Sequence, residues 1–93
     1  MFYVYILQSE KSGRYYTGFT DDIERRLQEH NNGENPSTHN KGPWKLVYQE
    51  PFPTRSEAMK RENEIKRKKS RKSIQQIIEY YAQYPLTTPR SLI

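Results

Sequence analysis

The sequence contains no cysteine, and this absence excludes disulfide bonds, zinc–thiolate sites and thiol nucleophiles. It also has no apolar run close to the ~20 residues that a membrane-spanning helix needs. The chain starts with a strand-like segment in place of the basic-then-apolar layout of a signal peptide. Apolar residues make up only 32% of its 93 residues, so the core must draw on aromatic residues, above all the eight tyrosines. These features predict one small, soluble, cytoplasmic domain.

Positive charge is present in excess. The net charge is +5, and basic residues gather between positions 60 and 72, where the only acidic residues are two glutamates. Such a block favours a polyanionic partner, with nucleic acid ahead of an anionic membrane surface. A solvated helix face explains a basic run equally well when the run is taken alone. The residues that we assign to nucleic-acid contact are Lys60, Lys66, Arg67, Lys68, Lys69, Arg71 and Lys72.

The first third of the chain predicts a β-hairpin followed by a helix. Residues 2–8 alternate in the pattern of a strand, and residues 15–19 return as a second strand after a turn-forming segment. Thr20 and the two aspartates after it offer an N-cap and first-turn negative charge. The helix that they begin should run to about His30.

After a polar loop at residues 34–43, the chain predicts a third strand and a second helix. Residues 44–49 are rich in aromatic and β-branched residues, as strands are. Thr54 and Glu57 then form the pattern of a capping box. The helix that starts there should run to about Lys68.

A last helix should begin at Ser70 or Ser73. Its apolar residues recur at helical spacing and predict a core-facing stripe, although a protein-interaction face is a weaker alternative. We expect a domain over residues 1–83 and a flexible tail over residues 84–93. The predicted fold is a mixed α/β (α+β) domain with a three-stranded antiparallel sheet and flanking helices. The stripe consists of Ile74, Ile77, Ile78 and Tyr81.

Polar residues fall on faces of two helices that the spacing turns inward. In the first helix, Arg26 and His30 lie at i+3 and i+7 from the apolar Ile23. In the second, Glu62 follows the inward-facing Ala58 by one turn and needs an arginine, a lysine or a metal ion beside it. A partly buried Arg26–Glu62 salt bridge is one structural alternative. A His30 that only interacts with the helix dipole is another.

These residues and the tyrosines of the hairpin resemble the motif set of the GIY-YIG nuclease superfamily. The closest likeness is to its small, stand-alone, single-domain bacterial members of the UPF0213 type. Tyr3-Val4-Tyr5 stands where the first motif ends in its tyrosine, and Tyr16-Thr17-Gly18 stands for the second motif. After the second motif, three more residues lie at positions where the family carries its characteristic polar residues: Arg26, His30 and Glu62. The resemblance covers nearly the whole chain and implies a GIY-YIG-like domain.

The resemblance implies a metal-dependent endonuclease that hydrolyses phosphodiester bonds in nucleic acid, with DNA expected ahead of RNA. Glu62 would hold one ion, Mg²⁺ or Mn²⁺, and Arg26 would bind the scissile phosphate. Tyr16 is the candidate general base and Tyr5 would orient the water, while His30 could relay a proton. No sequence-reading motif accompanies this set, so we expect structure-selective or promiscuous cleavage in DNA repair or processing, by a protein that is monomeric when free.

A catalytically weak or inactive nucleic-acid-binding module of the same fold is the alternative function. Tyr3 occupies the position of the first motif's glycine. Asn63 adjoins Glu62, whereas many family members carry a polar residue, often asparagine, further downstream. These two departures motivate the alternative.

Overall fold

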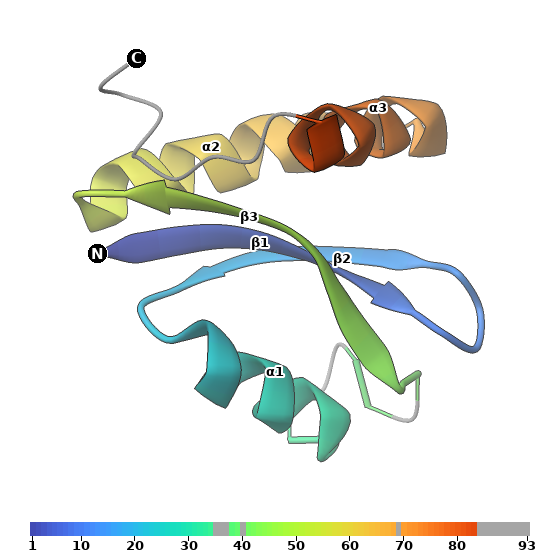
Figure 1. The fold of residues 1–93 in the computed structure, drawn as a ribbon. Helices are drawn as coiled ribbons and strands as arrows, with labels where there is room; N and C mark the ends of the chain where they lie inside the picture. Colours follow the sequence, from blue (N-terminus) through green and yellow to red (C-terminus); the bar gives the residue numbers. More distant parts are fainter. Residues whose placement is uncertain (35–37, 40, 69, 84–93) are drawn as a thin grey trace.

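The computed structural model describes residues 1–34, 38–39, 41–68 and 70–83 (Figure 1). Lys69 and the predicted tail, residues 84–93, lie outside the described residues. The described chain forms one antiparallel sheet and three helices, as predicted, and the strand order is β2-β1-β3. The elements are β1 (Phe2–Ser9), β2 (Tyr15–Thr20), α1 (Ile23–Asn31), β3 (Trp44–Phe52), α2 (Arg55–Arg67) and α3 (Arg71–Gln83).

The third strand is longer than its sequence pattern indicated. It continues past residue 49 through Pro51 and ends at Phe52, and it pairs with β1 along its length. Proline usually ends a strand because it cannot donate a ladder hydrogen bond. Since β3 is an edge strand, it tolerates proline. The extension brings Glu50 into the sheet, where its side chain is fully buried.

The helices begin where capping residues satisfy their first backbone N–H groups. Asp22 caps α1, and its carboxylate accepts a hydrogen bond from the Arg25 backbone N–H at 3.1 Å. Thr54 caps α2 as predicted, and its hydroxyl accepts from the Glu57 backbone N–H at 3.3 Å. None of the described helices is both long enough and apolar enough to cross a membrane.

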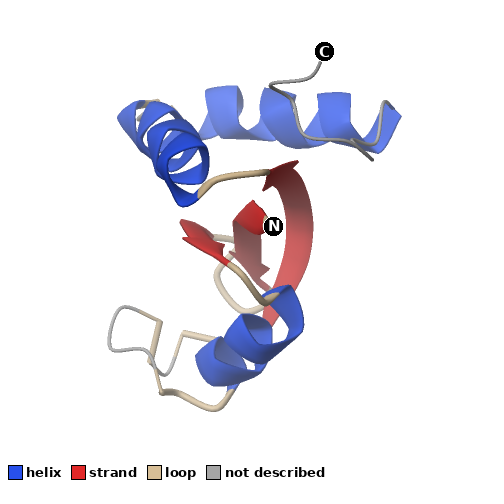
Figure 2. Ribbon diagram, turned by 90° about the vertical axis from the view of Figure 1, so that its left-hand side faces the viewer, coloured by secondary structure: helices blue, strands red, loops and turns tan. Residues whose placement is uncertain are grey.

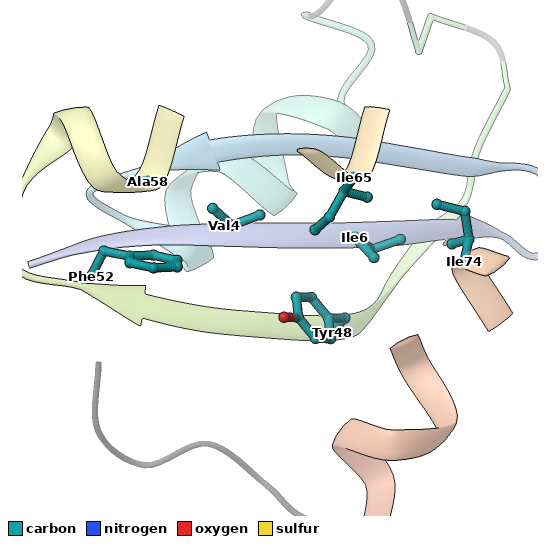
Figure 3. Close-up of a cluster of buried hydrophobic side chains, with 7 residues drawn as sticks. All are labelled: Val4, Ile6, Tyr48, Phe52, Ala58, Ile65 and Ile74. Atoms are coloured by element: carbon teal, nitrogen blue, oxygen red, sulfur yellow. The ribbon is translucent and has the colours of Figure 1, made fainter. Parts of the chain in front are cut away.

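The helices cover both faces of the sheet, with α2 and α3 on one face and α1 on the other (Figures 1 and 2). Strand residues alternate between the faces, so Val4 and Ile6 of β1 join the core under α2 and α3 (Figure 3). Tyr5 and Leu7 point the other way and pack with Trp44 under α1. One apolar cluster therefore holds α2 and α3 on the sheet, and a second cluster holds α1 on the opposite face.

The apolar stripe of α3 belongs to the core. Ile74 is buried, and the three other residues of the stripe are partly buried and pack against the same cluster as Val4 and Ile6. The Tyr81 ring lies 5.2 Å from the Tyr48 ring between centroids. The packing assigns the stripe to the interior and removes the observation that motivated a protein-interaction face.

A buried polar network joins β3 to α2. The Tyr48 hydroxyl donates a hydrogen bond to Oε1 of Glu50, and the Arg61 Nε–H donates to the same oxygen at 3.0 Å. Arg61 also pairs with Glu64 at 3.2 Å. Burial, and then the neighbouring Glu50, raise the pKa of Tyr48. Burial alone would lower the pKa of Arg61, but Tyr48 and Glu50 raise it, so Arg61 stays charged. Arg61, which lies within the basic block at residues 60–72, therefore belongs to this buried network.

Candidate active site

An open pocket of about 320 Å³ lies at the β2 edge of the sheet, and both α1 and α2 contribute to its walls. We call it the β2-edge pocket. Four of the five predicted catalytic and metal-binding residues line it: Tyr5, Tyr16, Arg26 and Glu62. They come from four different elements, so the fold, and no single segment, brings them together.

The two motif tyrosines lie on neighbouring strands on the α1 side of the sheet. Tyr5 pairs with Gly18 in the register of β1 and β2, and its ring centroid lies 6.4 Å from that of Tyr16. A Cβ atom on Gly18 would lie 2.6 Å from the Tyr5 hydroxyl oxygen and 2.8 Å from its ring carbon Cζ. Only glycine therefore leaves room for the Tyr5 ring above β2. Burial, and then the proximity of Tyr16, raise the pKa of Tyr5, so its hydroxyl stays protonated at neutral pH.

His30 lies behind the β2-edge pocket and does not line it. Its side chain is buried, with the Tyr5 hydroxyl 3.0 Å from Nε2 and the Thr38 hydroxyl 2.7 Å from Nδ1. The Tyr16 ring packs beside it, with centroids 4.8 Å apart. Burial, and then the charge of Arg26, lower the pKa of His30 below its usual value. His30 therefore has a hydrogen-bond partner on each ring nitrogen and holds the Tyr5 hydroxyl in place. Its role is not limited to an interaction with the helix dipole.

Arg26 and Glu62 face the same pocket but do not pair with each other. Arg26 pairs with Glu29 at 3.1 Å, and Glu62 pairs with Lys66 at 3.5 Å, each within its own helix. The Arg26–Glu62 salt bridge, which we considered as a structural alternative, is absent among the described residues. The Nε atom of Arg26 is buried and finds no hydrogen-bond acceptor within the described part of the chain. A buried guanidinium N–H without a partner is costly. The Arg26 side chain as a whole is 37% exposed and lines the pocket, so its guanidinium can bind an oxyanion there.

The carboxylates of the β2-edge pocket fit a metal ion that is shared with a substrate. Within the described ranges no three histidine, cysteine, aspartate or glutamate side chains form a metal-binding group. Mg²⁺ is commonly bound by one or two carboxylates together with waters and substrate phosphates, so one carboxylate suffices. Glu62 is 13% exposed, whereas Asp21, also in the pocket, is 62% exposed and pairs with Arg25. Glu62 is therefore the better ligand, and its ion pair with the half-exposed Lys66 is weak enough to be displaced.

The predicted nucleic-acid-binding residues that the structure describes lie on α2, at its C-cap and at the start of α3, and all are exposed. Ala58 and Ile65 of α2 are buried against the sheet. By helical periodicity Lys60 and Arg67 lie on the opposite side of that helix, away from the β2-edge pocket.

Two arginines of the β2-edge pocket were missed by the sequence analysis. Arg25 and Arg55 both line it. Arg55 is the first residue of α2, and in the sequence it stands out only as part of the segment after the Thr54 cap. The signal that could have found it is its position at the start of a helix that also carries Glu62.

Comparisons with known proteins identify the family of the chain. A family model described as the GIY-YIG catalytic domain matches residues 1–75. The chain therefore belongs to the GIY-YIG family, as its motifs predicted. It is similar to the UPF0213 protein SSP2268 of Staphylococcus saprophyticus, with 47% identity over 78 residues that cover 83% of this chain and 94% of that protein. It is also similar to the UPF0213 protein BH0048 of Halalkalibacterium halodurans, with 40% identity over 90 residues that cover 96% of this chain and 95% of that one.

A solved structure extends the likeness to the fold. The solution NMR structure of the UPF0213 protein BH0048 from Bacillus halodurans matches this chain with a TM-score of 0.54 and 37% sequence identity. The match covers 95% of this chain and 99% of that chain. The arrangement of sheet and helices is therefore that of a small GIY-YIG domain.

Proposed function

We propose that this protein is a metal-dependent endonuclease that hydrolyses phosphodiester bonds in DNA. The observation that carries the proposal is the convergence in the β2-edge pocket of a carboxylate, two phenols and a guanidinium whose buried Nε–H has no partner among the described residues. These groups match the chemistry of phosphodiester hydrolysis, and the GIY-YIG family model spans most of the chain. DNA is proposed ahead of RNA.

Arg26 binds the scissile phosphate in this proposal. Its guanidinium, which lines the pocket and is 37% exposed, donates to a phosphate oxygen, and its charge stabilises the extra negative charge of the transition state. Glu62 would hold one divalent ion, Mg²⁺ or Mn²⁺, which when bound supplies stabilisation of the phosphate charge and of the leaving 3′-oxygen. The two residues reach the substrate from opposite helices, α1 and α2.

The hydroxyl groups of the pocket orient and deprotonate the attacking water. Tyr5 is unsuited to act as the base because burial raises its pKa. Neutral His30 can accept a hydrogen bond from the Tyr5 hydroxyl at Nε2 while its Nδ1–H donates to the Thr38 hydroxyl. The Tyr5 oxygen can then accept a hydrogen bond from the water. Tyr16, which also lines the pocket, is the proposed general base.

A non-catalytic nucleic-acid-binding module of the same fold is the second candidate. The ion pairs of Glu62 with Lys66 and of Arg26 with Glu29 favour it, because each neutralises a group that cleavage requires. This candidate keeps salt-sensitive binding and loses hydrolysis.

A cleavage screen separates the two candidates. The wild-type protein is incubated with single-stranded, duplex, nicked and branched DNA and with matched RNA, with Mg²⁺, with Mn²⁺ and with excess chelator. We expect cleavage of at least one DNA structure with either metal, and none in chelator, because metal-held charge is needed at the phosphate. Salt-sensitive binding to these substrates with no cleavage under any metal condition would favour the non-catalytic module.

A further inference from the structure

Two arginines lie over aromatic rings on the same face of the edge strand β2. The Arg55 Cζ atom lies 5.6 Å from the centroid of the Phe19 ring, and the Arg71 Cζ atom lies 5.1 Å from that of Tyr15. Tyr15 and Phe19 both pack against the core under α2 and α3. Because they are four residues apart on one strand, the two pairs are spaced by about 13 Å.

These two guanidinium groups have no carboxylate partner within the described ranges. In this they differ from Arg25, Arg26 and Arg61, each of which forms at least one ion pair. Both are exposed. A ring beneath a guanidinium holds it by cation–π attraction and leaves its N–H groups available to a phosphate.

The hairpin turn leaves room for the second pair. Gly13 has a φ of +77°, and a Cβ atom there would lie 3.2 Å from the Nη2 atom of Arg71. Glycine thus permits both the turn and the close approach of the guanidinium. Arg71 is the first residue of α3, and its guanidinium lies against Gly13 and Tyr15 of the hairpin.

The two pairs extend from the β2-edge pocket along its strand. Phe19 and Arg55 line the pocket, while Tyr15 and Arg71 lie at the other end of β2, beside the hairpin turn. A spacing of about 13 Å is several times the ~3.4 Å rise of one nucleotide, so the two guanidinium groups would contact different phosphates. Arginine binds phosphate through a planar fork of donors, which suits repeated backbone contacts.

We infer that Arg55 and Arg71 form a backbone track, in which one strand of DNA runs along the β2 edge from the β2-edge pocket toward the hairpin turn. The inference rests on the proposed function and names the path of its substrate. Contacts to phosphates alone carry no sequence information, so the track positions the strand without reading its bases. Lys60 and Arg67, on the far side of α2, lie off this path.

The salt dependence of DNA binding tests the track. Binding is measured with excess chelator, so that the metal-dependent cleavage does not take place. Fluorescence anisotropy measures Kd for labelled single-stranded and duplex DNA from about 50 to about 200 mM salt. Arg55→Gln and Arg71→Gln should each lower the magnitude of the slope of log Kd against log salt by about 0.9 on duplex or about 0.7 on single-stranded DNA. Arg55→Lys and Arg71→Lys, which keep the charge, should restore most of the slope.

Lys45→Gln provides the matched control, because Lys45 is exposed on the opposite edge strand, β3. It removes the same charge and should leave the slope unchanged. Wild-type slopes in both arginine variants, an equal loss in Lys45→Gln, or no binding to either DNA would overturn the track. If the track variants lose their slopes but the protein never cleaves, the proposed function fails and the track stands. If the slopes do not change and cleavage requires Glu62, the track fails and the function stands.

Discussion

Glu62→Gln should lower the rate of metal-dependent DNA cleavage by at least about 10³-fold. Glutamine keeps the size of the side chain and removes the charge that would hold the ion, and metal stabilisation of a phosphoryl transition state is worth several kcal/mol. The other carboxylate of the β2-edge pocket, Asp21, is exposed and paired with Arg25, so it is a poor substitute. The rate is measured in single turnover on a DNA structure that the wild-type protein cuts.

Glu64→Gln is the control for this loss. Glu64 lies on the same helix, is exposed and pairs with Arg61, so its replacement changes the charge of α2 by the same amount outside the pocket. This variant should cleave at the wild-type rate. Wild-type cleavage by Glu62→Gln, or an equal loss in Glu64→Gln, would contradict the assignment of Glu62.

Arg61→Ala should lower the free energy of unfolding by about 3–5 kcal/mol. The Glu50 side chain is fully buried, and the guanidinium of Arg61 donates to it at 3.0 Å. Removing the arginine takes away the guanidinium that donates to the buried Glu50 carboxylate, which costs more than the loss of one neutral hydrogen bond. Urea denaturation followed by circular dichroism measures the change.

A double variant separates the cost of a stranded charge from the loss of contacts. Glu50→Leu combined with Arg61→Met removes both charges and keeps side chains of similar length, so it should be much more stable than Arg61→Ala alone. Arg14→Ala, at an exposed position, should change stability by less than about 0.5 kcal/mol. A loss below about 1 kcal/mol in Arg61→Ala would show that the network contributes little to the attachment of α2.

The parts of the site that depend on local periodicity could be predicted from the sequence. Helical spacing predicted inward faces for Arg26 and Glu62, and strand alternation predicted that Tyr5 lies on the face of its strand opposite to Val4 and Ile6. All three predicted site residues line the pocket. The predicted antiparallel sheet followed from the same patterns. Each of these features needs only residues a few positions apart.

The parts that depend on contacts between distant elements could not be predicted. His30 was expected near the chemistry, but its burial behind Tyr5 requires the packing of α1 on β1 and the return of Thr38. Glu50 lay beyond the expected end of its strand, and Arg61 looked like one more surface cation in a basic run. Their pairing across eleven residues is a product of the fold and leaves no repeating pattern in the sequence.

The central claim is that the scissile phosphate binds at Arg26 in the β2-edge pocket, and the single-turnover cleavage rate of Arg26→Ala tests it most directly. With protein and Mg²⁺ in excess, and with the fold verified by circular dichroism, the rate should fall by about 10²–10³-fold because a preorganised donor to the phosphate is lost. Arg26→Lys should fall in between, since it keeps the charge without the planar fork. Cleavage by Arg26→Ala at the wild-type rate would contradict the claim.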